Sequence, residues 1–241
     1  MSRTLFVTSP MMRGHDVVAL QDRLRDLGYF PGIRDGCYGP ATAGAVRTFQ
    51  REFRLKADGA CGASTRQMLE TATVAVRHRE PSAIALAALA EAGKHIGVRE
   101  DPPESNSNPF GKWFGLDEAP WCAIFISYCF SVGAGYTVAT SLLDKAPGVH
   151  PNGCAYVPSM MAWLFTDGFW VGRTEPIPGD IVIYNWDGGR VDHIGLIERY
   201  LGNGEIVAIE GNTSDADASN GGEVQRTTRS MRHVTGFGRV A

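Results

Sequence analysis

Three residues in the second half of the chain have side chains suited to nucleophilic catalysis. They are Cys122 in APWCAIFISYCF, His193 in VDHIGLIERY and Glu210 in EIVAIEGN. A cysteine nucleophile needs a base to take its proton and a third group to orient that base, and these residue types occur here in that order. A free thiol with a pKa of about 8.5 is mostly protonated at neutral pH, so it also needs a cationic neighbour or a helix N-terminus. The three residues therefore predict acyl transfer, in which a thiolate attacks a carbonyl.

The segment around Cys122 has the pattern of a helix that begins at this cysteine. Pro120 and Trp121 interrupt the preceding chain, and apolar residues then recur at helical spacing at Cys122, Phe125, Ile126, Cys129 and Phe130. This spacing places Cys122 in the first turn, where backbone N–H groups have no helical partner. We expect these groups to favour the thiolate and to form an oxyanion hole, in which loss of one donor typically lowers the rate about a hundredfold or more.

Alternating residues around His193 and Glu210 predict a β-hairpin. Residues 191–197 form the expected first strand, GlyAsnGly at 202–204 the turn, and residues 205–210 the second strand. Side chains two residues apart share one face of a strand, and the side chains expected on one face here are those of Ile206, Ala208, Glu210 and Asn212. Both polar groups can therefore approach one imidazole.

Glu210 is the expected orienter of His193. Its carboxylate should accept the Nδ1–H of the imidazole and leave Nε2 for the thiol of Cys122, while Asn212 assists this orientation or lines the site. Asp192 competes because it is the chain neighbour of His193. Adjacent strand residues face opposite sides, which favours Glu210. The candidate catalytic residues are accordingly Cys122, His193, Glu210 and Asn212.

Four short motifs in this half of the chain resemble one known family when taken together. They are ProTrpCys at 120–122, GlyAspIleValIleTyr at 179–184, AspHisIleGly at 192–195 and GluGlyAsn at 210–212. The combination is similar to the CHAP family of cysteine- and histidine-dependent amidohydrolases and peptidases, over roughly residues 82–241. The resemblance implies a papain-like α+β domain with an antiparallel sheet that cleaves amide bonds in bacterial peptidoglycan.

Metal ligands are sparse around these motifs. Some CHAP domains have a calcium-binding cluster of aspartates just before the cysteine, whereas only Asp117 and Glu118 precede Cys122 here. Histidines paired as His-x-His, which would favour a metallopeptidase, do not occur in the sequence. We therefore predict no metal and no cofactor.

The N-terminal part contains an internal repeat. AspGlyCysTyrGlyProAlaThr at 35–42 and AspGlyAlaCysGlyAlaSerThr at 58–65 both read Asp-Gly-x-x-Gly-x-x-Thr, 23 residues apart. Each copy predicts a tight turn that leads into a helix. Together with LeuGln at 20–21 and PheGln at 49–50, the pattern resembles the peptidoglycan-binding domain of cell-wall hydrolases. The resemblance implies a small all-α bundle that tethers an enzyme to its polymeric substrate.

Several residues in each part of the chain are candidates for ligand contact. In the N-terminal bundle the candidates are Gly28, Tyr29, Asp35 and Tyr38, although a structural role in turns is the favoured interpretation. In the catalytic part, aromatic side chains are candidates for lining the cleft: Trp121 and Trp186, with Trp163 and Trp170. Loops at 101–120 and 144–158 are expected to shape substrate choice.

Length and composition bound the organisation of the chain. A chain of 241 residues with 44% hydrophobic content can bury one medium core and one small core. We predict a peptidoglycan-binding domain over 14–70, a polar linker over 71–81, and a catalytic α+β domain over 82–241 whose first helix starts after Pro81 and Ser82.

The expected partner is bacterial peptidoglycan, and the expected state is a monomer. The net charge of −3 disfavours a nucleic-acid binder, which would present a basic face. The apolar runs are too short or too interrupted by charge to predict membrane insertion. Residues 1–16 lack the apolar core of a secretory signal, so we expect synthesis in the cytoplasm and action on the wall after release, a logic that resembles a phage endolysin.

The five cysteines form an odd number without the dense spacing of a disulfide framework. They predict a reduced protein with one reactive thiol. A disulfide between Cys37 and Cys61, which lie in the two repeated turns, is an alternative that the sequence leaves open. A zinc site built from Cys122, Cys129 and Cys154 is disfavoured because no Cys-x-x-Cys pair is present.

Several functions are compatible with this pattern. The amide bond cleaved can join muramic acid to L-alanine, or it can lie in the stem peptide or its cross-bridge. A transpeptidase can use the same acyl-enzyme with a different acceptor. A non-catalytic wall-binding or structural protein is the alternative from another class, but it would not need Cys122, His193 and Glu210 in this order.

Overall fold

The computed structural model describes residues 3–72, 80–214 and 220–240. These residues form two compact units, one over residues 3–72 together with residues 164–171, and the other over the remaining described residues from 80 to 240. The predicted order, an all-α unit before an α+β unit with an antiparallel sheet, is confirmed. Most of the predicted linker 71–81 lies outside the described residues, so the domain limits 14–70 and 82–241 stay predictions.

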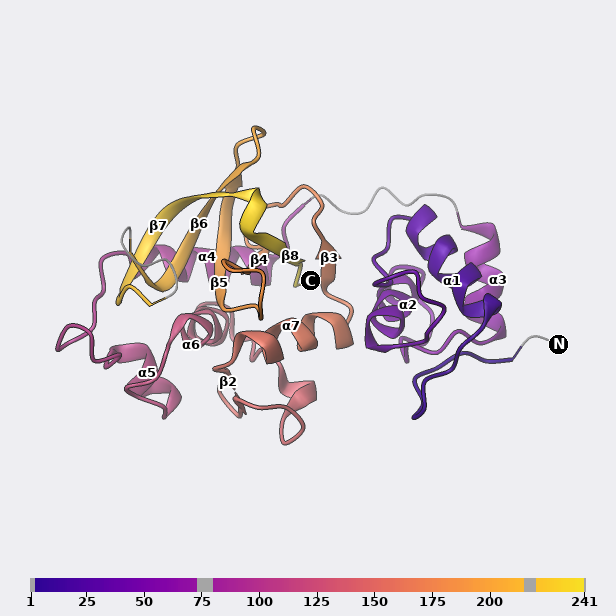
Figure 1. Ribbon diagram of the computed structural model, residues 1–241, viewed down its shortest axis with the longest axis horizontal. Coiled ribbons are helices and arrows are strands. Elements are labelled where there is room, and N and C mark those ends of the chain that lie inside the picture. The colour runs from indigo at the N-terminus through magenta and orange to yellow at the C-terminus, as the bar shows by residue number, and fades with distance from the viewer. Residues whose placement is uncertain (1–2, 73–79, 215–219, 241) are drawn as a thin grey trace. The chain divides into compact units, whose positions relative to one another are not determined.

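Within residues 3–72, helices α1 (His15–Asp26), α2 (Pro40–Glu52) and α3 (Ala63–Thr71) make up the N-terminal unit, as Figure 1 shows. Helix α2 begins with a proline, at a position where the missing N–H costs no hydrogen bond. The apolar faces of the helices meet in one core, which includes Leu20, Leu24, Val46, Phe49 and Leu69.

A buried glutamine holds the first repeated turn in place. The Nε2 of Gln21 donates to the Asp35 carboxylate at 3.1 Å and to the Thr42 hydroxyl at 3.2 Å. Its Oε1 accepts the backbone N–H of Gly36 at 3.0 Å. One side chain therefore satisfies both donors and acceptors of the turn, which is what burial of those polar groups requires.

Gln50 has the same role in the second turn. Its Nε2 donates to the Asp58 carboxylate at 3.1 Å and to the Thr65 hydroxyl at 3.0 Å. Its Oε1 accepts the backbone N–H of Gly59 at 2.8 Å. The repeated motif is thus a pair of equivalent hydrogen-bonding sets, each centred on a glutamine from the preceding helix.

Replacing Gln50 with leucine should destabilise the N-terminal unit by about 1–3 kcal/mol, because the buried N–H of Gly59 loses its acceptor. Gln67→Leu, on an exposed position of α3, is the matched control and should change stability by less than about 0.5 kcal/mol. Calorimetric unfolding of the whole chain measures the change in stability that each substitution causes. Equal effects would contradict the role given to Gln50.

The C-terminal unit combines helices with a sheet. Its helices are α4 (Ala83–Lys94), α5 (Pro109–Phe114), α6 (Cys122–Tyr128) and α7 (Val157–Thr166), with a π-helical turn η1 (Cys129–Gly133) and 3₁₀ turns η2 (Thr140–Leu142) and η3 (Met231–His233). Among the described residues, no helix has the length and apolar character needed to cross a membrane.

A six-stranded sheet, with strand order β3-β8-β4-β5-β6-β7, organises this unit. Its strands are β3 (Trp170–Gly172), β4 (Ile181–Tyr184), β5 (His193–Tyr200), β6 (Glu205–Thr213), β7 (Glu223–Ser230) and β8 (Val234–Gly238). The pairs β4–β5, β4–β8, β5–β6 and β6–β7 are antiparallel, and Figure 1 shows β5, β6 and β7 side by side. A separate short pair consists of β1 (Val149–His150) and β2 (Gly153–Cys154).

The predicted hairpin is confirmed. Strands β5 and β6 pair around the turn at 201–204, and Gly195 lies opposite Glu210. In the pairing of β6 with β7, the register shifts between Glu210 and Thr213, and Asn212 takes a positive φ of 57°. Such an irregularity re-aims the side chains that follow it, so the simple alternation of faces ends at Glu210.

Helix α6 packs tightly against this hairpin. It contacts both β5 and β6, and the two approach each other closely at Gly211. A Cβ at Gly211 would lie 2.7 Å from the Cβ of Phe125 and 2.8 Å from the ring of Trp121. Only glycine permits this approach, which explains the residue between Glu210 and Asn212. The contact fixes the start of α6, and with it Cys122, against the strand that carries Glu210.

Candidate active site

The residues of the predicted catalytic order come together from one helix and one hairpin. Cys122 is the first residue of α6, as its sequence spacing predicts, and 5% of its surface is exposed. His193 opens β5 and Glu210 lies near the end of β6, and both are fully buried. Of these three side chains, only that of the cysteine has surface that an incoming group can reach.

The imidazole of His193 contacts Glu210 through Nε2, at 3.2 Å from Oε2. Its Nδ1 is buried and has no hydrogen-bond partner of normal geometry among the described residues. The Cys122 thiol lies near enough to raise the pKa of the imidazole, so Nδ1 is the nitrogen left for the thiol. This corrects the expectation that Nδ1 faces Glu210. Position on a strand selects the face of the sheet, but packing selects the edge of the ring.

Glu210, and not the neighbouring Asp192, is the carboxylate that meets His193. Asp192 lies one residue before β5, and its side chain is exposed. The carboxylate in contact with the imidazole is thus that of Glu210, and its role as the orienter stays a prediction.

Electrostatics favour an imidazolium at His193. Burial lowers the pKa of His193, but hydrogen bonds and charge from Cys122 and Glu210 outweigh it and raise the pKa from 6.5 to about 9. Burial raises the pKa of the Glu210 carboxyl, yet contacts with His193 and Arg229 bring it below its ordinary value. A cationic imidazole beside a thiol stabilises the thiolate, which is the nucleophilic form.

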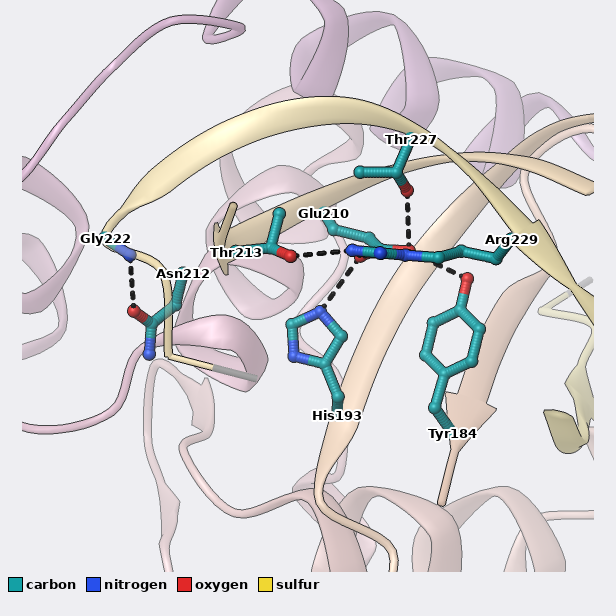
Figure 2. A network of polar contacts seen from close by, with 8 residues as sticks. All are labelled: Tyr184, His193, Glu210, Asn212, Thr213, Gly222, Thr227 and Arg229. Carbon is teal, nitrogen blue, oxygen red and sulfur yellow. Dashed lines mark hydrogen bonds and ion pairs between the residues drawn. The ribbon is translucent and has the colours of Figure 1, made fainter. Parts of the chain in front are cut away.

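Glu210 accepts further hydrogen bonds from β4 and β7, which Figure 2 shows converging on one carboxylate. The hydroxyls of Tyr184 and Thr227 donate to Oε1 at 2.8 Å and 2.9 Å. Arg229 donates from Nη2 to Oε2 at 2.8 Å. A buried carboxylate with this many donors keeps both its orientation and its charge.

Tyr184, Thr227 and Arg229 are site residues that the sequence does not reveal. Tyr184 ends the GlyAspIleValIleTyr motif, where an aromatic residue is ordinary for a strand. Thr227 and Arg229 are two residues apart on β7, so strand alternation predicts that their side chains share one face. The pairing of β6 with β7 determines which residues this face contacts, and a single sequence does not specify that pairing.

Asn212 is turned away from the imidazole. Its Oδ1 accepts the backbone N–H of Gly222 at 3.3 Å, and its Nδ2 donates to Asn220 at 3.0 Å. Figure 2 shows the side chain beside Gly222. The expectation that Asn212 and Glu210 share one face is wrong, because the irregularity in β6 lies between them. A role for Asn212 in lining the site stays a prediction.

The tryptophans separate into buried and accessible ones. Trp121 is fully buried and its Nε1 donates to Glu100 at 2.9 Å, so it has no surface with which to contact a substrate, contrary to expectation. Trp186 is half-buried, and its ring centroid lies 6.2 Å from that of His193. It stays a candidate for substrate contact. Two other candidates are also buried, Trp163 and Trp170.

In the N-terminal unit, most of the candidate ligand contacts are parts of the core or of turns. Tyr29 and Tyr38 are buried, and the hydroxyl of Tyr38 donates to a backbone carbonyl at 2.8 Å. Neither presents the surface that a ligand contact needs. Asp35 is exposed, but its carboxylate accepts the N–H of Cys37 at 2.8 Å within the first repeated turn. Gly28 has a positive φ of 81° after α1. These contacts support the structural interpretation.

The other cysteines are free and buried: Cys37, Cys61, Cys129 and Cys154. The alternative disulfide between the two repeated turns is therefore not formed. Burial raises the pKa of the Cys129 and Cys154 thiols, which disfavours their thiolates. In the part of the chain that the structure describes, no three His, Cys, Asp or Glu side chains are grouped to hold a metal.

Two family models match separate parts of the chain. One describes a peptidoglycan binding domain and matches residues 13–69. The other describes the CHAP domain and matches residues 115–212. The second match includes Cys122, His193 and Glu210, whereas Arg229 lies beyond its end.

Curated relatives match over shorter stretches. The N-acetylmuramoyl-L-alanine amidase CwlM of Mycobacterium tuberculosis is 44% identical over 71 residues, which is 30% of this chain and 18% of that protein. A spore cortex-lytic enzyme of Bacillus cereus is 48% identical over 60 residues, which is 25% of this chain and 23% of that protein. The chain thus spans about a fifth of the length of these relatives.

One solved structure is also similar in part. It is that of a fused Zn-dependent amidase/peptidase/peptidoglycan-binding domain-containing protein from Clostridium acetobutylicum. The match has 27% identity and a TM-score of 0.29, and it covers 41% of this chain and 48% of that chain.

Proposed function

We propose that this chain, which carries a peptidoglycan-binding domain and a CHAP domain, is a hydrolase that cleaves an amide bond of bacterial peptidoglycan through a cysteine acyl-enzyme. The observation that carries the proposal is the environment of Cys122. The thiol lies at a helix start beside an imidazole whose Nε2 is bound to a buried carboxylate. That arrangement supplies a nucleophile, its base and the orienter of the base.

The mechanism is acyl transfer in two steps. The thiolate of Cys122 attacks the amide carbonyl, and backbone N–H groups at the start of α6 stabilise the oxyanion. The imidazolium of His193 gives the proton on Nδ1 to the leaving amine as the C–N bond breaks. The neutral imidazole then takes a proton from water, which attacks the thioester and releases the acid. Glu210 holds the ring through both steps and stays ionised.

The N-terminal unit is proposed to bind the wall and so to raise the local concentration of substrate. It contains a cavity of about 330 Å³. Stem peptides of peptidoglycan present methyl groups together with carboxylates and amines, and this cavity has an apolar floor and a rim of both charges. Its lining includes Leu5, Leu20, Leu69, Arg23, Arg66 and Glu70.

Filling this cavity should weaken wall binding. Ala19 lines it from an exposed position on α1, so Ala19→Arg should reduce binding at least about tenfold, or about 1.4 kcal/mol, without loss of fold. Ala63→Arg, at an exposed position of α3 outside the cavity, is the matched control. Co-sedimentation of the full chain with isolated peptidoglycan measures the wall binding of both variants. Undiminished binding by Ala19→Arg would place wall binding elsewhere on the unit.

The proposed activity is tested by digesting isolated peptidoglycan and analysing the soluble products by mass spectrometry. New N-terminal L-alanine with intact glycan would establish an N-acetylmuramoyl-L-alanine amidase. Other new amino ends would establish an endopeptidase of the stem or cross-bridge. Products joined to an added amine acceptor would mark a transpeptidase. Binding without any new end would leave the non-catalytic alternative.

A further inference from the structure

Arg229 stands out because it is an almost buried cation that the proposed acyl transfer does not use. Only 16% of its side chain is exposed. Its Nη2 lies 2.8 Å from Oε2 of Glu210, and its Nε lies 3.3 Å and 3.2 Å from the two carboxylate oxygens. The same Nη2 donates to the Thr213 hydroxyl at 2.8 Å. Several contacts therefore fix the guanidinium beside the orienting carboxylate.

The charges of this cluster alternate. In the reactive state the order is thiolate at Cys122, imidazolium at His193, carboxylate at Glu210 and guanidinium at Arg229. The sum is zero with Arg229 and minus one without it. A net charge in a buried cluster is unfavourable, and the cluster can remove it by protonating one of its anions. We propose that Arg229 is a positioning residue that supplies the counter-charge needed to keep Cys122 and Glu210 ionised together.

The groups that face Glu210 from each neighbouring strand are consistent with this role. Tyr184 on β4 donates as a neutral hydroxyl, since burial raises the pKa of this phenol well above its ordinary value. The hydroxyl of Thr227 on β7 donates to Glu210 and that of Thr213 on β6 accepts from Arg229, and neither brings a charge. Among the described residues, the other cation in contact with Glu210 is the imidazolium of His193, which the reaction itself discharges. Arg229 is therefore the permanent positive charge at this carboxylate.

Aromatic packing holds Arg229 in place. Its Cζ lies 5.3 Å from the centroid of the Trp186 ring. That ring stacks on Tyr184 with centroids 4.9 Å apart and planes at 13°. The guanidinium is thus enclosed between an aromatic face and the carboxylate, where the local dielectric is low and each charge acts strongly. The planar guanidinium group is important here, because a lysine at this position keeps the charge but loses the multiple contacts.

The test uses alkylation of the thiol, so that it needs no substrate. The rate of carbamidomethylation of Cys122 by iodoacetamide, in which the thiolate displaces iodide, is followed against pH, with the modified peptide identified by mass spectrometry. In Arg229→Met the rise of the curve should move to higher pH by about one unit, which makes alkylation about tenfold slower on its acidic side. In Arg229→Lys the curve should stay near that of the wild type, while turnover of peptidoglycan falls.

A matched control lies on the same strand. Arg226 forms a comparable ion pair with Glu198 at 2.9 Å, but this pair is exposed and away from the site. Arg226→Met should leave the alkylation curve unchanged. An unchanged curve in folded Arg229→Met would overturn the inference, as would a shift in Arg229→Lys as large as that expected for methionine. If the methionine variant does not fold, the lysine variant still tests the inference, because a shifted alkylation curve in that variant would overturn it.

The inference rests on the proposed function only through the role of Cys122 as the reactive thiol, and the experiment separates the two. If Cys122 in the wild type is alkylated no faster than Cys129, both the assignment of Cys122 as the nucleophile and the proposed acyl transfer are contradicted. Fast alkylation of Cys122 that does not change when Arg229 is replaced would contradict only the proposed counter-charge role of Arg229. Fast alkylation and a shifted curve, without any cleavage of peptidoglycan, would keep the counter-charge and overturn the proposed substrate.

Discussion

Cys122→Ala is expected to abolish cleavage of peptidoglycan, with a loss in kcat of about 10⁵–10⁶-fold. The expected loss is this large because no other group in the site can form the acyl-enzyme, and His193 and Glu210 act only on the nucleophile and the leaving group. Release of soluble fragments from isolated peptidoglycan measures it. Binding to the insoluble wall should be unchanged, since the proposed binding cavity contains other residues.

Cys129→Ala is the matched control for this substitution. Cys129 follows directly after α6 and is fully buried, and burial raises the pKa of its thiol well above the ordinary value. The variant should lose about 1 kcal/mol of stability from a small cavity and keep its turnover within about twofold. Equal turnover of Cys122→Ala and the wild type would remove the proposed nucleophile and favour a wall-binding protein.

Glu210→Gln is expected to lower kcat by about 10⁴-fold while leaving Cys122 in place. The amide is neutral, so it cannot stabilise the imidazolium, and its NH₂ must face donors from Tyr184, Thr227 or Arg229. Leaving Arg229 without its carboxylate should also destabilise the fold by about 3–5 kcal/mol. The unfolding temperature and kcat should therefore both fall in Glu210→Gln, whereas in Cys122→Ala only kcat should fall.

The pH dependence of the residual activity gives Glu210→Gln a distinctive signature. In the wild type, contacts with Cys122 and Glu210 raise the pKa of His193 to about 9, so the imidazolium persists into alkaline solution and activity should fall only above that value. Removing the carboxylate charge leaves only the contact with Cys122 to oppose burial, so the pKa of His193 should be lower than in the wild type. The alkaline limb of kcat/KM should then move to lower pH.

Asp192→Asn is the control for charge near the histidine. Asp192 is the chain neighbour of His193, but it lies just before β5 and its side chain is exposed. This variant should keep kcat within about twofold and leave both limbs of the profile in place. A loss as great as that of Glu210→Gln would make Asp192 the effective orienter, and an unmoved alkaline limb in Glu210→Gln would contradict the role of its carboxylate.

Local patterns in the sequence determined the elements of this protein. Helical spacing after Pro120 and Trp121 placed Cys122 at the start of α6, and a glycine-rich turn with alternating flanks placed His193 and Glu210 on one hairpin. These features depend on residues close together in the chain, which is why they can be read from it. The repeated turns of the N-terminal unit were visible for the same reason.

Only the tertiary structure decided how the elements meet. The pairing of β7 with β6 brings Thr227 and Arg229 to Glu210, and the irregularity in β6 turns Asn212 away. Packing also placed Nε2 of His193, rather than Nδ1, against the carboxylate. Each of these outcomes depends on contacts between residues far apart in the chain, and such contacts are set by strand register and by the shape of the core, which no local pattern contains.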